Sequence, residues 1–355
     1  DGDSSIAFYK MAIDIFEASN VVKPQRYSTA VYQQVLDACN AVGNYSLLYR
    51  VIKLMEHTNC TLDADIFVSL LKGYGKYGDV VAFVETFKHY KALAGSLVNK
   101  KEFDVYASLI GAYFDSGKPE DALTFFNKIL NNNVPGSALV PVVSEIVQSF
   151  SRTGDYPSAV KWIKRVDSDD KLAPVNMPTL VCTMSAIVDA GDMATARELF
   201  DFAASRKDAK SSVFDVARSD FVSLCVKAND PESLYKAIKE TQLREGVWDL
   251  TSVVNVSRYL LDIGDIDFAL RVFEIQTKRY FDYMDNRGLP VDNQGADALD
   301  QLFKALKETG HFDISSALSL LQSNVFKSQF LSDTNSTFIE CLKTLWNSQA
   351  DGTLK

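Results

Sequence analysis

Apolar residues recur at steps of three and four along nearly the whole chain, which is the spacing that places side chains on one face of an α-helix. The clearest stretch runs from Asp104 to Leu130, DVYASLIGAYFDSGKPEDALTFFNKIL, and predicts two amphipathic helices joined by a turn around Gly117. Variants of this stretch occur before and after it. The pattern therefore predicts an all-α array of helical hairpins, whose function should be sought on the surface of the array.

A glycine marks the expected end of the first helix in each hairpin, and Asn229 takes the same place once. The glycines are Gly43, Gly78, Gly117, Gly154, Gly191, Gly264 and Gly310. Both residue types tolerate the left-handed conformation that closes a helix. An aspartate often follows directly and should cap the second helix, as at Asp79, Asp155, Asp192 and Asp265.

Counting back fourteen residues from each turn gives repeat starts at Thr29, Ala64, Phe103, Val140, Met177, Asp215, Leu250 and Ala296. The fourth residue of each repeat is apolar except at Arg218. Nine residues past the turn, a bulky apolar column recurs in the second helices at Ile52, Phe87, Phe126, Ile163, Phe200, Ile238 and Phe273. A small residue four positions earlier, as at Ala122, should let the two helices of a hairpin approach closely.

The remaining segments fit around this array. We expect residues 1–28 to form a partial repeat and its connector, residues 29–322 to form eight repeats of about 35 residues, and residues 323–355 to form capping helices and a tail. The long interval before Gly310 leaves room for an inserted loop from Asp285 to Asp292, marked by Gly288 and Pro290.

Composition narrows the classes of function. The net charge of −9 disfavours indiscriminate binding of polyanions, and no apolar run is long enough for a membrane span. The opening residues lack the pattern of a signal peptide, so we expect any targeting segment to lie outside this chain. The five cysteines show no CxxC spacing, the three histidines lie far apart, and neither GxSxG nor a P-loop occurs. We therefore expect no metal, no cofactor and no catalytic residues.

With an aromatic at position four, Gly at fifteen and Ala at twenty, the repeat resembles the pentatricopeptide repeat (PPR) family. The segments that match best are VYASLIGAY at 105–113 and FVSLLKGYG at 67–75. Tetratricopeptide repeats are the alternative, but their tighter length suits the observed spacings less well. The drift in length is similar to that of fungal and animal organellar members of the PPR family. The resemblance implies a right-handed α-solenoid whose first helices line a groove for single-stranded RNA.

The resemblance also implies which residues read the bases. In the family, the fifth and the last residue of a repeat contact the base edge. Here Ser144 with Asn176 suggests a purine, most simply adenine, and Ser219 with Asp249 suggests guanine. Gln33 and Asp63 occupy the same two positions in the first repeat. Several other repeats carry Val or Ala at position five, which cannot hydrogen-bond to a base.

Basic residues on the first helices are candidates for contact with phosphate: Lys72, Lys76, Arg152, Lys227 and Arg258. The competing interpretation is that they are ordinary solvated charges. All first helices together carry eight basic and twelve acidic residues, so a continuous basic track is not encoded. RNA binding should therefore involve a few nucleotides or need a part of the protein outside this chain.

Two functions follow from these observations. The first is an RNA-binding protein without catalysis that acts in the stability, processing or translation of an organellar mRNA, with the mitochondrial matrix implied by the family resemblance. The second is a scaffold that binds proteins, such as the mitochondrial ribosome or a translation-activator complex, in the same groove. The acidic first helices favour the second function. DNA is not an expected partner.

Overall fold

The computed structural model describes residues 2–21, 27–60, 62–95, 101–132, 134–207, 212–244, 247–290 and 293–309, and also 320, 323, 326–327, 338–340 and 342–343. Every regular element in this part of the chain is helical, so the expected all-α fold is confirmed. The chain forms two compact units, residues Asp1–Thr179 and Leu180–Lys355. The right-handed superhelix implied by the family resemblance stays a prediction.

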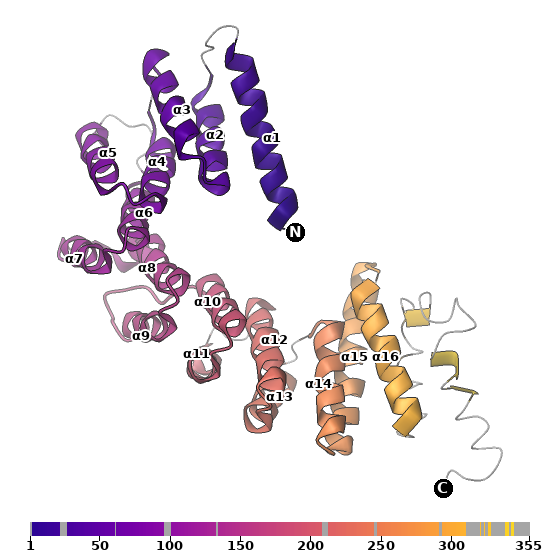
Figure 1. Cartoon of the computed structure of the whole chain (residues 1–355). Helices are drawn as coiled ribbons and strands as arrows, with labels where there is room; N and C mark the ends of the chain where they lie inside the picture. The colour runs from indigo at the N-terminus through magenta and orange to yellow at the C-terminus, as the bar shows by residue number, and fades with distance from the viewer. Residues whose placement is uncertain are drawn as a thin grey trace. The chain divides into compact units, whose positions relative to one another are not determined.

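The helices pair into hairpins that are stacked side by side within each unit (Figure 1). A leading helix α1 (Gly2–Val21) precedes them, and a short 3₁₀ helix η1 (Gly136–Leu139) leads into α8. The first helices are α2 (Thr29–Val42), α4 (Ala64–Lys76), α6 (Glu102–Asp115), α8 (Val140–Arg152), α10 (Met177–Ala190), α12 (Ser212–Lys227), α14 (Leu250–Asp262) and α16 (Asn293–Thr309). The second helices are α3 (Tyr45–His57), α5 (Val80–Leu93), α7 (Pro119–Leu130), α9 (Tyr156–Asp167), α11 (Met193–Ser205), α13 (Pro231–Arg244) and α15 (Ile266–Arg287).

These first helices begin within three residues of the repeat starts expected from the sequence. The division of the chain at residues 28 and 322 into end segments and array stays a prediction. Residues 310–319 and most residues that follow lie outside the described part, including Gly310 and most of the expected capping helices.

The turns between paired helices have the expected conformation. Gly43, Gly78, Gly117, Gly154, Gly191 and Gly264 have φ between 71° and 87°, and Asn229 has φ 54°. The left-handed closure is therefore confirmed at each described turn. The caps are confirmed as well: Asp79, Asp155, Asp192 and Asp265 each accept a hydrogen bond from the backbone N–H three residues later.

The expected loop at residues 285–292 is partly wrong. Helix α15 continues through Arg287 and closes at Gly288, whose φ is 62°. Tyr280, Phe281 and Met284 extend the buried face of α15, and this apolar contact keeps the following polar residues helical.

The first helices α4 and α6 pack closely against each other in the first unit. A Cβ atom on Gly75 would lie 2.4 Å from the Cα and 2.5 Å from the Cβ of Ala112, so only glycine fits at this backbone separation. On the other side of α4, a Cβ on Gly73 would lie 2.5 Å from Asn40 Oδ1 and 3.1 Å from a methyl group of Leu48. Glycines therefore hold α4 close to its neighbours on both sides.

Arg218, the exception in the apolar column, is fully buried. Its guanidinium forms an ion pair with Asp215 one helical turn earlier and stacks 4.9 Å from the ring of Phe214. These two neighbours allow a charged side chain to replace an apolar one.

Within the described residues, no helix combines the length and the apolar composition needed to cross a bilayer.

Candidate functional site

A groove of about 740 Å³ crosses the first helices of the first unit. Residues of α2, α4, α6 and α8 line it: Asn40, Ala41, Lys72, Lys76, Ser108, Gly111, Ala112, Phe114, Asp115, Glu145, Gln148, Arg152 and Thr153. Positions nine and thirteen of a repeat lie one turn apart on the same face of the first helix, so the residues at these positions line the groove together. The groove is thus built from the equivalent faces of consecutive hairpins.

Three of the five expected phosphate contacts meet in this groove. Lys72 and Lys76 lie one turn apart on α4 and are both exposed, and Arg152 lies at the end of α8. Lys76 Nζ donates a hydrogen bond of 2.6 Å to the backbone carbonyl of Asn40 in α2, which anchors this ammonium at the groove edge. Lys227 and Arg258 are exposed on α12 and α14 of the second unit.

Two carboxylates hold Arg152 in place. Its Nη2 lies 2.8 Å from Glu145 Oε1 on α8 and 3.4 Å from Asp115 Oδ1 at the end of α6, and it also donates 2.9 Å to Ser149 Oγ. Burial alone would lower the pKa of the guanidinium, but Glu145 and Asp115 raise it. Arg152 is therefore always charged, and its charge is largely balanced by its neighbours.

Gly111 makes room for this network. A Cβ at Gly111 would lie 2.5 Å from Glu145 Oε1 and 3.6 Å from Arg152 Nη2. The side chains of α8 can therefore lie across α6 at this point. The groove carries three cations and two carboxylates, a small positive excess on a chain whose net charge is −9.

The structure brings Ser144 and Asn176 together. Asn176 Nδ2 lies 3.4 Å from Ser144 Oγ, and Asn176 Oδ1 accepts 2.9 Å from the backbone N–H of Thr179. Asn176 is thus the cap of α10 and the neighbour of Ser144 at the same time. Both side chains are half-buried and lie outside the lining of the groove.

Ser219 and Asp249 form the equivalent pair in the second unit. Ser219 Oγ donates 2.8 Å to Asp249 Oδ2, which also accepts 2.6 Å from Ser252 Oγ. The other carboxylate oxygen of Asp249 caps α14 by accepting from Ser252 N–H at 2.8 Å. Three donors already use this carboxylate, so less of its hydrogen-bonding capacity is left for a ligand than at Asn176.

The first repeat shows no such pairing. Asp63 caps α4 by accepting 3.0 Å from Ile66 N–H, and the half-buried Gln33 lies on α2. Among the described residues no hydrogen bond joins Gln33 to Asp63.

Sequence reasoning missed Asn40, Glu145 and Gln148, which also line the groove. The available signal was their position: Glu145 and Gln148 are the sixth and ninth residues of their repeat, on the same helical face as the cations. Within the described part of the chain, no three His, Cys, Asp or Glu side chains gather as metal ligands would.

Comparison with known proteins identifies the class of repeat. Residues 104–134, which span most of α6 and all of α7, match the model of the PPR repeat. The expected resemblance is therefore confirmed for this hairpin, and the PPR repeat family is non-catalytic. The fungal mitochondrial-like subtype stays a prediction.

Solved structures of pentatricopeptide repeat proteins are also similar to this chain. The protein PPR10 in complex with an 18-nt psaJ RNA element is 15% identical, with a TM-score of 0.47 over 96% of this chain and 47% of that one. The crystal structure of PPR10 from maize is 15% identical, with a TM-score of 0.30 over 99% of this chain and 62% of that one. This chain thus spans about half the length of the RNA-bound protein. No curated protein sequence matches significantly.

Proposed function

We propose that the first unit binds a short segment of single-stranded RNA through the groove across α2, α4, α6 and α8, without catalysis. One observation carries the proposal: Lys72, Lys76 and Arg152 converge in a single groove, and the PPR-matching hairpin supplies part of its lining. Two of these cations have ammonium groups exposed to solvent, as contact with phosphate requires.

Phosphates and bases would bind at different ends of the first helices. Ser144 is the fifth residue of its repeat and Arg152 the thirteenth, so about 12 Å of helix axis separates them. The RNA backbone would follow the Lys76 and Arg152 end, while a base would reach the Ser144 and Asn176 end. The Ser144 hydroxyl and the Asn176 amide would then exchange their weak mutual contact for hydrogen bonds to the base.

Titration of the whole chain with a labelled 12-nucleotide RNA at several salt concentrations tests this proposal. Each phosphate neutralised on a single strand contributes about −0.7 to the slope of log affinity against log salt. From about 50 mM to about 200 mM salt, affinity should fall about twentyfold if all three cations bind phosphate, and about sevenfold if only the lysines do. Affinity weaker than about 10⁻⁴ M without a salt slope would contradict the proposal.

Ser144→Ala and Asn176→Asp should alter base preference. Ser144→Ala should weaken binding to adenine-containing RNA about fivefold or more, because a hydrogen bond to the base edge is lost. Asn176→Asp keeps the cap of α10 and should shift preference toward guanine, since it recreates the pair of residue types at Ser219 and Asp249. Binding to four homopolymeric RNAs measures both effects. Ser46→Ala, an exposed serine of α3, is the control, and equal losses on all four RNAs would refute base reading.

Glu145→Gln should strengthen RNA binding. The substitution removes one carboxylate that holds Arg152 and frees the guanidinium for phosphate, which we expect to raise affinity about fivefold. Glu120→Gln on α7 changes the net charge equally but lies outside the groove, and should leave affinity unchanged. Equal behaviour of the two variants would show that Arg152 does not contact RNA.

The biological role that fits this chemistry is binding to an organellar mRNA, in the mitochondrial matrix, that affects its stability, processing or translation. A bound segment is shielded from exonucleases and cannot pair with other strands, so binding alone can have these effects. The PPR-like repeat supports this role.

A protein ligand is the second candidate. The groove also contains two carboxylates, Asp115 and Glu145, and a basic peptide or a protein of the mitochondrial ribosome or a translation-activator complex would pair with them in place of Arg152. The Glu145→Gln variant separates the two candidates, because it should weaken binding of a basic partner and strengthen binding of RNA.

A further inference from the structure

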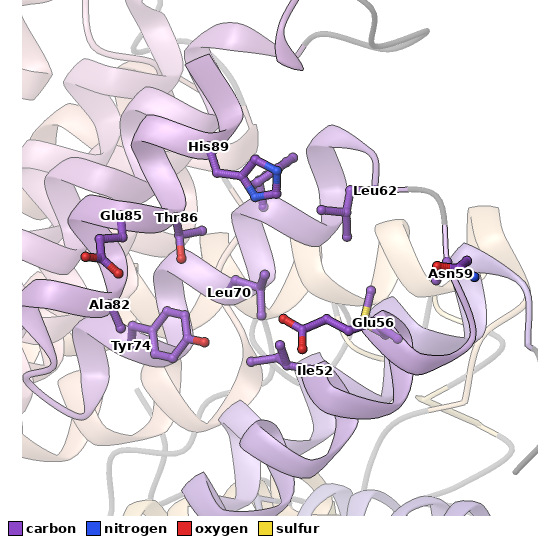
Figure 2. Close-up of a pocket in the computed structure, with 13 residues that line it drawn as sticks. Ile52, Glu56, Asn59, Leu62, Leu70, Tyr74, Ala82, Glu85, Thr86 and His89 are labelled. Atoms are coloured by element: carbon purple, nitrogen blue, oxygen red, sulfur yellow. The ribbon is translucent and has the colours of Figure 1, made fainter. Parts of the chain in front are cut away.

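A second hollow, of about 600 Å³, lies in the first unit apart from the groove across α2, α4, α6 and α8. Helix α3, helix α5 and the connector between α3 and α4 form its walls, and α4 forms its floor (Figure 2). It shares no lining residue with the groove described above. The two sites therefore lie on different surfaces of the same hairpins.

The floor of this outer pocket is apolar. Phe67, Leu70 and Tyr74 of α4 lie in it, with Ile52 of α3 and Leu62 of the connector at the sides. Figure 2 shows the ring of Tyr74 between Ala82 and Ile52, with its hydroxyl directed toward the side where Leu70 and Glu56 lie. No side chain in the described part of the chain hydrogen-bonds to this hydroxyl. Its pKa is raised to about 12, mainly by burial, so it stays protonated and can donate.

Two carboxylates stand at the mouth of the pocket. Glu56 of α3 and Glu85 of α5 are both exposed, and neither forms an ion pair with a described residue. Glu56 lies in the last turn of α3, where the helix dipole disfavours negative charge. Two uncompensated carboxylates over an apolar floor are complementary to a ligand that joins an apolar side chain to positive charge. They repel phosphate, which argues against RNA at this surface.

We propose that the outer pocket is a docking site for a protein partner, through a helical segment with an apolar anchor flanked by Lys or Arg. The anchor fills the space over Phe67 and Leu70, and the flanking cations pair with Glu56 and Glu85. The surrounding backbone is set by hairpin packing, so the pocket is formed before the partner arrives. The protein would thus hold RNA on one surface and a basic partner segment on another.

Fluorescence anisotropy with three labelled 14-residue amphipathic peptides tests this proposal on the whole chain. One peptide carries leucines on one face with lysine flanks, the second replaces the lysines with glutamates, and the third replaces the leucines with serines. The lysine-flanked leucine peptide should bind at least about tenfold tighter than the other two, because the pocket needs both features. Equal affinity for all three peptides would overturn the proposal.

Glu56→Lys/Glu85→Lys should weaken binding of the lysine-flanked leucine peptide at least about tenfold, with a smaller effect at high salt. Glu120→Lys/Asp170→Lys reverses two other exposed carboxylates of the first unit and should leave peptide binding unchanged. The two double variants change the net charge equally and should therefore change RNA affinity equally, because the outer pocket shares no lining residue with the groove. Competition between RNA and peptide would place them at one site and overturn the proposal.

Sedimentation of the chain alone tests whether a second copy of this chain, rather than another protein, occupies the outer pocket. The apolar residues Phe8, Met11 and Ile15 are 69%, 58% and 64% exposed on one face of α1. The proposal expects a monomer at micromolar concentration. A dimer that both Glu56→Lys/Glu85→Lys and Phe8→Asp dissociate would assign the pocket to a second copy instead.

Discussion

Replacing both groove lysines in Lys72→Ala/Lys76→Ala should weaken binding of single-stranded RNA about tenfold or more at low salt, for every sequence tested. Both ammonium groups are exposed on one face of α4, and each can neutralise one phosphate. The slope of log affinity against log salt should therefore become less negative by about 1.4. Anisotropy titrations at several salt concentrations measure the affinity and the slope together.

Lys88→Ala/Lys128→Ala is the matched control. These two exposed lysines belong to the second helices α5 and α7, outside the groove, and their removal changes the net charge by the same amount. A general electrostatic attraction would respond equally to both double variants. A loss confined to Lys72→Ala/Lys76→Ala locates RNA in the groove, and equal losses would contradict that location.

Gly75→Ala should destabilise the first unit by about 2 kcal/mol, although alanine favours helices more than glycine does. The added Cβ would lie 2.4 Å from the Cα of Ala112, so the backbones of α4 and α6 must separate. Since both helices line the groove, the same variant should weaken RNA binding. Urea unfolding followed by circular dichroism should show a lower midpoint for this unit.

Gly95→Ala supplies the comparison, because nothing lies within 4 Å of a Cβ at Gly95. It should change stability by less than about 0.5 kcal/mol. If Gly75→Ala behaved like Gly95→Ala, the close packing of α4 on α6 would not be a fixed feature of the fold.

The hairpin turns could be predicted because their cause is local. A backbone in the left-handed region favours glycine or asparagine whatever packs around it. Gly43 and Asn229 therefore indicate the end of a helix without any knowledge of its neighbours. The aspartate caps that follow depend on the next three residues only. Neither feature requires knowledge of the neighbouring hairpins.

Packing between helices was harder to foresee. Four of the seven second helices carry alanine where they approach the first helix, at Ala122, Ala159, Ala196 and Ala269, whereas α3, α5 and α13 carry Leu48, Phe83 and Leu234. The structure shows how the first of these larger residues is accommodated. Gly73 on the neighbouring first helix α4 provides the missing space, since a Cβ there would lie 3.1 Å from Leu48. A compensation that crosses from one repeat to the next cannot be found by aligning each repeat separately.

The sequence singled out the three cations that line the groove, but not the residues that surround them. Position thirteen singled out Lys76 and Arg152, but the register of α6 against α8 decides that Asp115 and Glu145 reach Arg152. Likewise, counting charges over all first helices gives an acidic total, whereas this groove has a positive excess. Local geometry, rather than net charge, decides whether phosphate can approach.

Photo-cross-linking of the whole chain to a 4-thiouridine RNA, followed by mass spectrometry of the linked peptides, tests RNA binding in the groove most directly. Cross-links should fall on peptides of the first helices α4, α6 and α8, and Lys72→Ala/Lys76→Ala should remove them. Cross-links confined to the second helices α5, α7 and α9, or cross-links that persist in the double variant, would contradict the groove as the RNA site.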